Sequence, residues 1–140
     1  MVEVKIKINL PASGSGIDFA QGGVMIYGSD QSYLKLDVFA SSNTRQIEFF
    51  KQINNAPAGQ ANYGSIPLGP PADYTWLRLA KRTVSGHDQY TAYSSQDGTD
   101  WVRGGTWNAS LGISPQIALF AQNRSGFLVD FSYVHVSTLP

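Results

Sequence analysis

Short segments in which apolar and polar residues alternate run through the chain, and this period of two constrains its fold more than any other feature. In residues 2–9, VEVKIKIN, every second side chain is valine or isoleucine and the others are charged or polar. Such alternation places one face of a β-strand on a core and the other face in water. A strand is therefore predicted almost from the first residue.

Further segments have the β-branched and aromatic content of strands. Segment 44–53 fits either a helix or a strand by its periodicity, and its composition favours the strand. Segment 54–74 is rich in Pro, Gly, Ala and Asn, which predicts a long loop with a short edge strand at 63–66. The other predicted strands are 22–28, 33–40, 74–83, 88–95, 101–107, 116–122 and 127–137.

Glycine, serine and aspartate separate these segments. Residues 11–16, PASGSG, end the first strand, and residues 29–32, SDQS, form the turn of a hairpin. Hairpin turns are also predicted at 85–88, 96–100 and 123–126, of which the second, with its Asp-Gly pair, has the strongest signal. About eight or nine antiparallel strands without a convincing helix predict an all-β, two-sheet jelly-roll sandwich.

Composition narrows the classes of partner and chemistry. The 140 residues are enough for one buried core, so we assign residues 1–140 to a single domain. Lys plus Arg equals Asp plus Glu at 10 each, and this balance provides no net field that would attract nucleic acid or an anionic membrane. Cysteine is absent, which excludes disulfides, thiolate zinc sites and a cysteine nucleophile. No apolar stretch has the length of a membrane span or the form of a signal peptide.

A series of segments, in this order and spacing, resembles a known domain. They read GGVMIYGSDQSYLKLDV at 22–38, WLRLAKR at 76–82, YTAYSSQDGTDW at 90–101, IALFAQ at 117–122 and VDFSYVHV at 129–136. Together they resemble the concanavalin-like jelly-roll domain at the C-terminus of family-43 glycoside hydrolases such as β-xylosidases, and related accessory domains. The resemblance runs from about Gln21 to Ser137, although no single motif in it is specific.

The resemblance implies a secreted, non-catalytic module beside a glycoside hydrolase domain, with any signal peptide outside this chain. It also implies a structural calcium near the joined termini of the domain, with Asp130 as a ligand. Domains of this family begin with further strands upstream of the segment that matches residues 2–10. We therefore expect an uncovered sheet edge here, which a preceding domain, a partner chain or a strand-paired dimer would cover.

A saccharide site needs aromatic rings for the C–H faces of a sugar and planar or charged groups for its hydroxyls. Predicted strands in this chain carry both kinds of side chain at alternate positions, so we expect one open sheet surface that binds an oligo- or polysaccharide. The candidate residues are Tyr33, Lys35, Asp37, Glu48, Trp76 and Arg78, with Tyr63, Tyr74 and Trp107 as weaker candidates near the ends of loops. The alternative is a half-solvated outer face with cross-strand ion pairs.

Catalysis by this chain is not expected. A glycosidase needs two carboxyl groups facing each other across a cleft, and most Asp residues here lie in predicted turns. Glu48 and Asp37 could share one sheet face, and they are the pair that a catalytic role would require. The Glu-x-Asp-x-x-Glu strand motif of catalytic jelly-roll glucanases is absent.

Segment 93–101, YSSQDGTDW, could form a catalytic loop, a calcium loop or a tight turn. Its two aspartates occupy one tight turn and point outward, which favours a hairpin with Trp101 packed back on the sheet. His87 and His135 are far apart and lack the spacing of paired metal ligands.

The sequence therefore favours a non-catalytic carbohydrate-binding or accessory module of a carbohydrate-active enzyme. Trp76 or Tyr33 would stack on the sugar, and the charged candidates would hydrogen-bond its hydroxyls. The alternative function is a structural domain that buttresses a glycoside hydrolase domain without binding sugar on its own.

Overall fold

The computed structural model describes residues 1–10, 17–54, 56 and 58–139, which form ten strands and no helix. The strands are β1 (Val2–Ile8), β2 (Gln21–Ser29), β3 (Ser32–Ser41), β4 (Thr44–Ile53), β5 (Tyr63–Gly69), β6 (Thr75–Val84), β7 (His87–Ser95), β8 (Val102–Asn108), β9 (Gln116–Gln122) and β10 (Val129–Val136). The turn predicted at 11–16 lies outside the described residues. Segment 44–53 is a strand, and the short edge strand predicted at 63–66 extends to Gly69.

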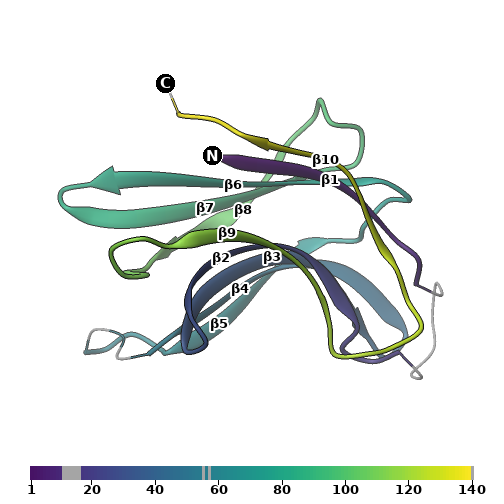
Figure 1. Ribbon diagram of the computed structural model, residues 1–140, viewed down its shortest axis with the longest axis horizontal. Coiled ribbons are helices and arrows are strands. Elements are labelled where there is room, and N and C mark those ends of the chain that lie inside the picture. Colours follow the sequence, from purple (N-terminus) through teal and green to yellow (C-terminus); the bar gives the residue numbers. More distant parts are fainter. Residues whose placement is uncertain (11–16, 55, 57, 140) are drawn as a thin grey trace.

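The strands form two antiparallel sheets stacked face to face (Figure 1). Sheet A has the order β10-β1-β6-β7-β8, and sheet B has the order β5-β4-β3-β2-β9. The predicted all-β, two-sheet jelly-roll sandwich is confirmed. The described residues contain no helix that is long and apolar enough to cross a bilayer.

Two expectations about strand partners are wrong. The turn at 123–126 does not close a hairpin, because β9 pairs with β2 in sheet B whereas β10 pairs with β1 in sheet A. The first strand is not a sheet edge either, since β1 lies between β10 and β6. The Met1 amino group donates to the carbonyl oxygen of Ser137 at 2.7 Å, so the two ends of the chain meet at one end of sheet A (Figure 1).

Apolar residues at alternate positions of both sheets fill the space between them. Leu34, Leu36 and Val38 of β3 face Leu77 and Leu79 of β6 across this interior, and all five are buried. On the side of β5 and β8, the indole of Trp107 packs on the ring of Phe49, with ring centroids 6.2 Å apart.

Because side chains alternate along a strand, burying one row of β3 places the other row on the outer face of sheet B. Figure 1 shows that sheet B is arched, with its hollow side turned away from sheet A. This concave outer face receives Tyr33, Lys35 and Asp37 of β3.

Replacement of Leu36 tests the position of the core. Leu36→Ala should lower the free energy of unfolding by about 2–5 kcal/mol, because it leaves a cavity between the two sheets. Leu128→Ala, which truncates the same side chain at an exposed position, should change it by less than about 0.5 kcal/mol. Urea unfolding of both variants measures the difference, and equal effects would contradict the assignment of the interior.

Candidate functional site

The six residues expected on one saccharide-binding surface divide between two sheets. Tyr33, Lys35, Asp37 and Glu48 lie on the concave outer face of sheet B, and Trp76 and Arg78 lie on the outer face of sheet A. The expectation of one shared surface is wrong, because β6 pairs with β1 and β7 rather than with β3 or β4. Alternation identifies which residues share a side of a strand, but it does not identify the sheet to which the strand belongs.

Lys35, Asp37 and Glu48 form a charged cluster at the centre of the concave face. Asp37 and Glu48 are directly opposite each other on β3 and β4, as the sequence suggested. The Lys35 Nζ lies 3.2 Å from Asp37 Oδ2 and 3.5 Å from Glu48 Oε1. Lys35 also donates to the side-chain oxygen of Gln21 on β2, and the Ser65 hydroxyl on β5 donates to Glu48 at 2.6 Å. The cluster therefore links four neighbouring strands of sheet B.

The charged cluster is buried although it lies outside the sandwich interior. Its three residues are at most 7% exposed, and neither oxygen of Asp37 accepts a hydrogen bond from a described residue. Burial raises the pKa of Asp37 to about 7, with the Glu48 charge adding to the rise and the Lys35 charge opposing it. Because the two carboxyl groups share one ammonium on neighbouring strands, they do not face each other across a cleft as a glycosidase pair does.

Aromatic and amide side chains surround this cluster. The rings of Tyr33 and Phe50 pack at 6.1 Å with an interplanar angle of 33°, and the Tyr33 hydroxyl donates to the side-chain oxygen of Gln52 at 3.1 Å. The exposed ring of Tyr63 lies opposite Gln52 at the edge strand β5. A ligand on the concave face would meet these groups before it met the charges beneath them.

Phe50 was not among the predicted site residues, although it follows Glu48 by two positions on the same strand. Because residues two positions apart lie on the same side of a strand, the alternation pattern alone would have identified Phe50. The sequence pattern does not identify Gln21 and Ser65, because their contacts with Lys35 and Glu48 depend on which strands are neighbours.

On sheet A, Arg78 is held by contacts within the chain. Its Nε and Nη2 atoms donate to Glu3 Oε2 at 2.9 and 2.7 Å, and its guanidinium lies 3.6 Å from the centre of the Trp101 ring. Tyr133 donates its hydroxyl to the other oxygen of Glu3. Partial burial acts to raise the pKa of Glu3, but the hydrogen bonds from Tyr133 and Arg78 lower it below its usual value.

Trp76 is also covered by neighbouring groups. The Lys5 ammonium lies 4.7 Å from the centre of the Trp76 ring and 4.5 Å from that of Tyr74. Gly98 approaches the indole so closely that a Cβ there would lie 2.8 Å from its nitrogen. The two sheet A candidates thus have partners already, and Trp107, a weaker candidate, faces the interior.

Segment 93–101 forms a tight connection between the paired strands β7 and β8. The Asp97 Oδ1 accepts the backbone N–H groups of Thr99 and Asp100 at 2.8 and 2.9 Å and the Ser95 hydroxyl at 3.0 Å. These bonds, the one from Asp100 foremost, hold the pKa of Asp97 well below its usual range. With φ 81° at Gly98, the interpretation of this segment as a turn is confirmed.

Asp130, the predicted calcium ligand, lies on β10 opposite Lys7 and is exposed. No group of three or more His, Asp or Glu side chains that could hold a metal ion occurs among the residues that the structure describes. His87 begins β7, whereas His135 lies on β10 opposite Glu3. A calcium ion at Asp130 stays a prediction.

No family model matches the chain, and no curated protein matches it. Several solved structures share its fold. A GH43 protein, BlXynB from Bacillus licheniformis, aligns with a TM-score of 0.71 at 18% identity over 95% of this chain and 26% of that one. A bifunctional GH43-CE protein of Bacteroides eggerthii aligns with a TM-score of 0.67 at 14% identity over 95% of this chain and 17% of that one.

A functionally unknown protein from Saccharomyces cerevisiae has the same fold, with a TM-score of 0.73 at 17% identity, over 99% of this chain and 69% of that one. The chain thus spans about a quarter or less of the GH43 proteins that it resembles. The resemblance to a β-sandwich part of such proteins is confirmed at the level of the fold.

The buried carboxyl of Asp37 predicts a pH dependence of stability. Its pKa is about 7 in the folded chain against 3.8 for the free side chain, so the folded state binds the extra proton between these values. The contribution of Asp37 to stability therefore falls as the pH rises from about 4 to about 7. Asp37→Asn removes this titration.

The difference in unfolding free energy between Asp37→Asn and the unmodified chain should shift in favour of the variant as the pH rises through that window. Urea unfolding at several pH values measures it. Asp88→Asn is the control, since the pKa of Asp88 is lowered, chiefly by its hydrogen bond with Lys81, so its titration lies below this window and its difference should stay constant within it. A pH-independent difference for Asp37→Asn would contradict the assignment.

Proposed function

We propose that the chain is a single-domain, non-catalytic accessory module of a carbohydrate-active enzyme, and that it binds saccharide on the concave outer face of sheet B. The observation that carries the proposal is the packed pair of Tyr33 and Phe50 beside the amide of Gln52, on a hollow face. Rings of this kind stack on the C–H faces of sugars, and amides bond to hydroxyls in either direction.

In this proposal the charged cluster supports the site from beneath. Lys35 holds the oxygen of Gln21, and the Gln122 amide donates to the same oxygen at 3.1 Å. The two amide side chains are therefore fixed in orientation, with Gln21 buried and Gln122 half-buried on the outer face of sheet B. The direct hydrogen bonds to hydroxyls come from Gln122 and Gln52, because Gln21 is buried and its amide nitrogen already donates to the carbonyl oxygen of Phe19. Asp37 and Glu48 keep Lys35 in place.

The outer face of sheet A is the weaker candidate for a sugar. A ligand there would have to compete with Glu3 for Arg78, and with Lys5 and the loop at Gly98 for the ring of Trp76. The contacts on this face fit a half-solvated surface with cross-strand ion pairs, the alternative weighed from the sequence, better than they fit a saccharide site.

A buttressing domain that does not bind sugar is the second candidate. Its support is the small share of the GH43 proteins that the chain spans, 26% and 17%, because the remainder of each such protein offers a neighbour to pack against. Under either candidate we expect a glycoside hydrolase domain as the partner and a location outside the cell.

Replacement of Tyr33 separates the two candidates. Binding of soluble xylan, arabinan or β-glucan by the chain, measured by affinity electrophoresis, should weaken by about tenfold in Tyr33→Ala, because the loss of a central aromatic contact commonly costs more than about 1 kcal/mol. Trp76→Ala is the matched control on sheet A and should bind like the unmodified chain. Absence of binding to every polysaccharide would favour the buttressing domain, and loss of binding in Trp76→Ala alone would place the site on sheet A.

The edge strands indicate where a strand-paired partner would bind. Three of the four edges carry features that discourage pairing: Pro67 in β5, Arg103 in β8 and Asp130 in β10, each with a shift of register against the neighbouring strand. The strand β9 has neither charge nor proline, and it pairs with β2 in continuous register. We therefore assign the expected dimer contact to β9 rather than to β1.

The sequence of β9, QIALFAQ, suits antiparallel pairing with a second copy of itself. Pairing centred on Leu119 opposes Gln116 with Gln122, Ile117 with Ala121, Ala118 with Phe120, and Leu119 with its own copy. Each large apolar side chain other than Leu119 meets alanine, the two glutamines meet each other, and no like charges meet. Seven residues a side fall short of the roughly 20–30 of a standard interface, so the dimer should be weak.

The dimer is tested by sedimentation velocity across a wide range of protein concentration. The unmodified chain should show a concentration-dependent dimer, and Leu119→Lys should stay monomeric because it places two charges against each other at the centre of the contact. Val134→Lys, at a half-exposed apolar position of β10, should dimerise as the unmodified chain does. A monomer at all concentrations, or a dimer lost in Val134→Lys, would exclude pairing through β9.

A further inference from the structure

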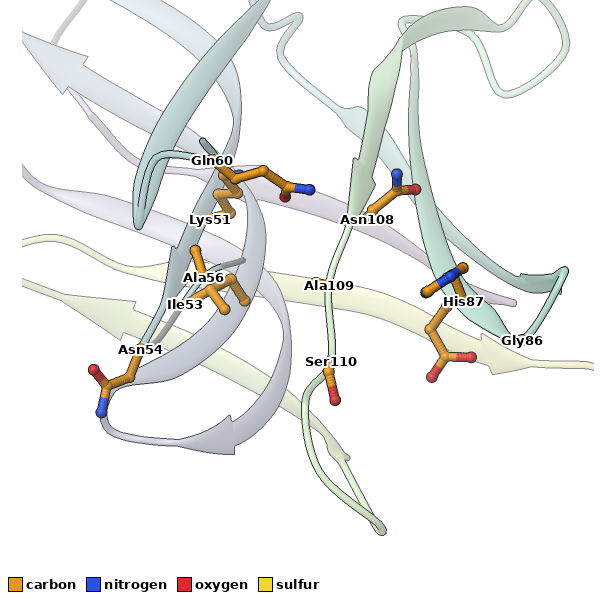
Figure 2. A pocket seen from close by; sticks show the side chains of 11 residues that line it. Lys51, Ile53, Asn54, Ala56, Gln60, Gly86, His87, Asn108, Ala109 and Ser110 are labelled. Carbon is orange, nitrogen blue, oxygen red and sulfur yellow. The ribbon is translucent and has the colours of Figure 1, made fainter. Parts of the chain in front are cut away.

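A pocket of about 760 Å³ opens between the two sheets at one end of the sandwich (Figure 2). Its walls come from the end of β4 and the connection to β5, from the turn between β6 and β7, and from the end of β8. In Figure 2, Gln60 extends from its wall toward the space between the walls, and Ala109 and Ser110 lie on the opposite wall. This volume falls within the range of about 300–1,000 Å³ that is usual for sites of small ligands.

Lys51 is the residue of this pocket that needs an explanation. It lies opposite Leu34, so its side chain faces the space between the sheets, and it is only 6% exposed. Its ammonium lies 4.5 Å from the centre of the Trp107 ring. The Trp107 indole is fixed in turn by a hydrogen bond of 3.4 Å to the carbonyl oxygen of Phe49.

The two buried lysines of sheet B differ sharply in their partners. Lys35 has two carboxylates within 3.5 Å and the oxygen of Gln21. Lys51 has the face of one indole, and no described residue offers its ammonium a carboxylate or a hydrogen-bond acceptor. Burial of a cation without an anion is costly, and a ring face compensates for only part of the lost hydration. The acidic side chain that lines the pocket, Asp88, is paired with Lys81, so no carboxylate of the described lining is available to Lys51.

The remaining lining favours a ligand with hydroxyl groups. The side chains of Gln60 and Ser110 have no hydrogen-bond partner among the described residues, and they present an amide and a hydroxyl group to the pocket. Asn108 borders the pocket with its backbone, because it follows the inward-facing Trp107 and its side chain lies on the outer face of sheet A. Asp88 also lines the pocket, but its carboxylate forms an ion pair with Lys81 at 2.8 Å and accepts a hydrogen bond from the Thr83 hydroxyl at 2.7 Å.

We infer that this pocket binds a small polyhydroxylated carboxylate, the chemistry of a sugar acid, with the carboxylate on the Lys51 ammonium. The hydroxyl groups of the ligand bond to Gln60 and Ser110, and its C–H groups lie against Ile53 and Ala109. The site goes beyond the proposed function: it lies between the sheets, whereas the saccharide site proposed above lies on the outer face of sheet B. An experiment that disproves ligand binding at one of these two sites therefore leaves the proposal for the other site intact.

NMR titration of the ¹⁵N-labelled chain tests the site, with the indole N–H of Trp107 as the reporter beneath the ammonium. D-glucuronate should shift this signal and bind at least about tenfold more tightly than D-glucose, which lacks the carboxylate, because a charge-assisted hydrogen bond is worth roughly that factor. Acetate and inorganic phosphate at equal ionic strength lack the hydroxyl groups and should bind correspondingly more weakly than glucuronate. Equal binding of acetate or phosphate would overturn the sugar-acid assignment.

Two variants remove the site in different ways. Lys51→Met keeps an unbranched chain on Trp107 without the charge, and Gln60→Glu adds a negative charge of the same shape at an exposed position of the wall, where the fold is not at risk. Both should lose about tenfold or more in affinity for glucuronate. Lys7→Met, which removes an exposed lysine outside the pocket, should bind glucuronate like the unmodified chain. Unchanged binding in Gln60→Glu, or no response of the unmodified chain to glucuronate, would overturn the proposal.

Discussion

The apolar layer between the two sheets determines where every other side chain lies. Since side chains alternate along a strand, filling the interior with Leu34, Leu36 and Val38 sends Tyr33, Lys35 and Asp37 to the outer face of sheet B. The same constraint places Lys51 inside, in a row with Phe49 and Ile53, at the end of the sandwich where the layer opens. The concave face and the interlayer pocket are thus two results of one packing arrangement.

The charged cluster adds specificity to this arrangement. A slip of β3 by one residue would move Lys35 and Asp37 into the apolar interior, where their desolvation would not be compensated. In the observed register their charges meet Glu48, and hydrogen bonds to Gln21 and Ser65 extend the contacts to β2 and β5. The cluster therefore fixes the relative positions of four strands while it supports the amides at the surface.

Local patterns predicted the strands well and their partners less well. The bounds of β3, β4, β6 and β9 lie within about two residues of the segments identified by alternation and composition, since those signals depend only on neighbouring residues. Sheet membership depends on the whole topology, so Trp76 and Arg78 were placed beside Tyr33 although they lie on another sheet. Lys51 was overlooked because a lysine at an inward position interrupts an otherwise apolar row.

The contact between Met1 and Ser137 brings the two ends of the chain together beside β1 and β10. A short peptide could join them without disturbing either sheet, and new ends could be opened at the exposed turn of Ser85 and Gly86. The fold is therefore suited to circular permutation, in which the order of its strands along the polypeptide changes and their order in space does not.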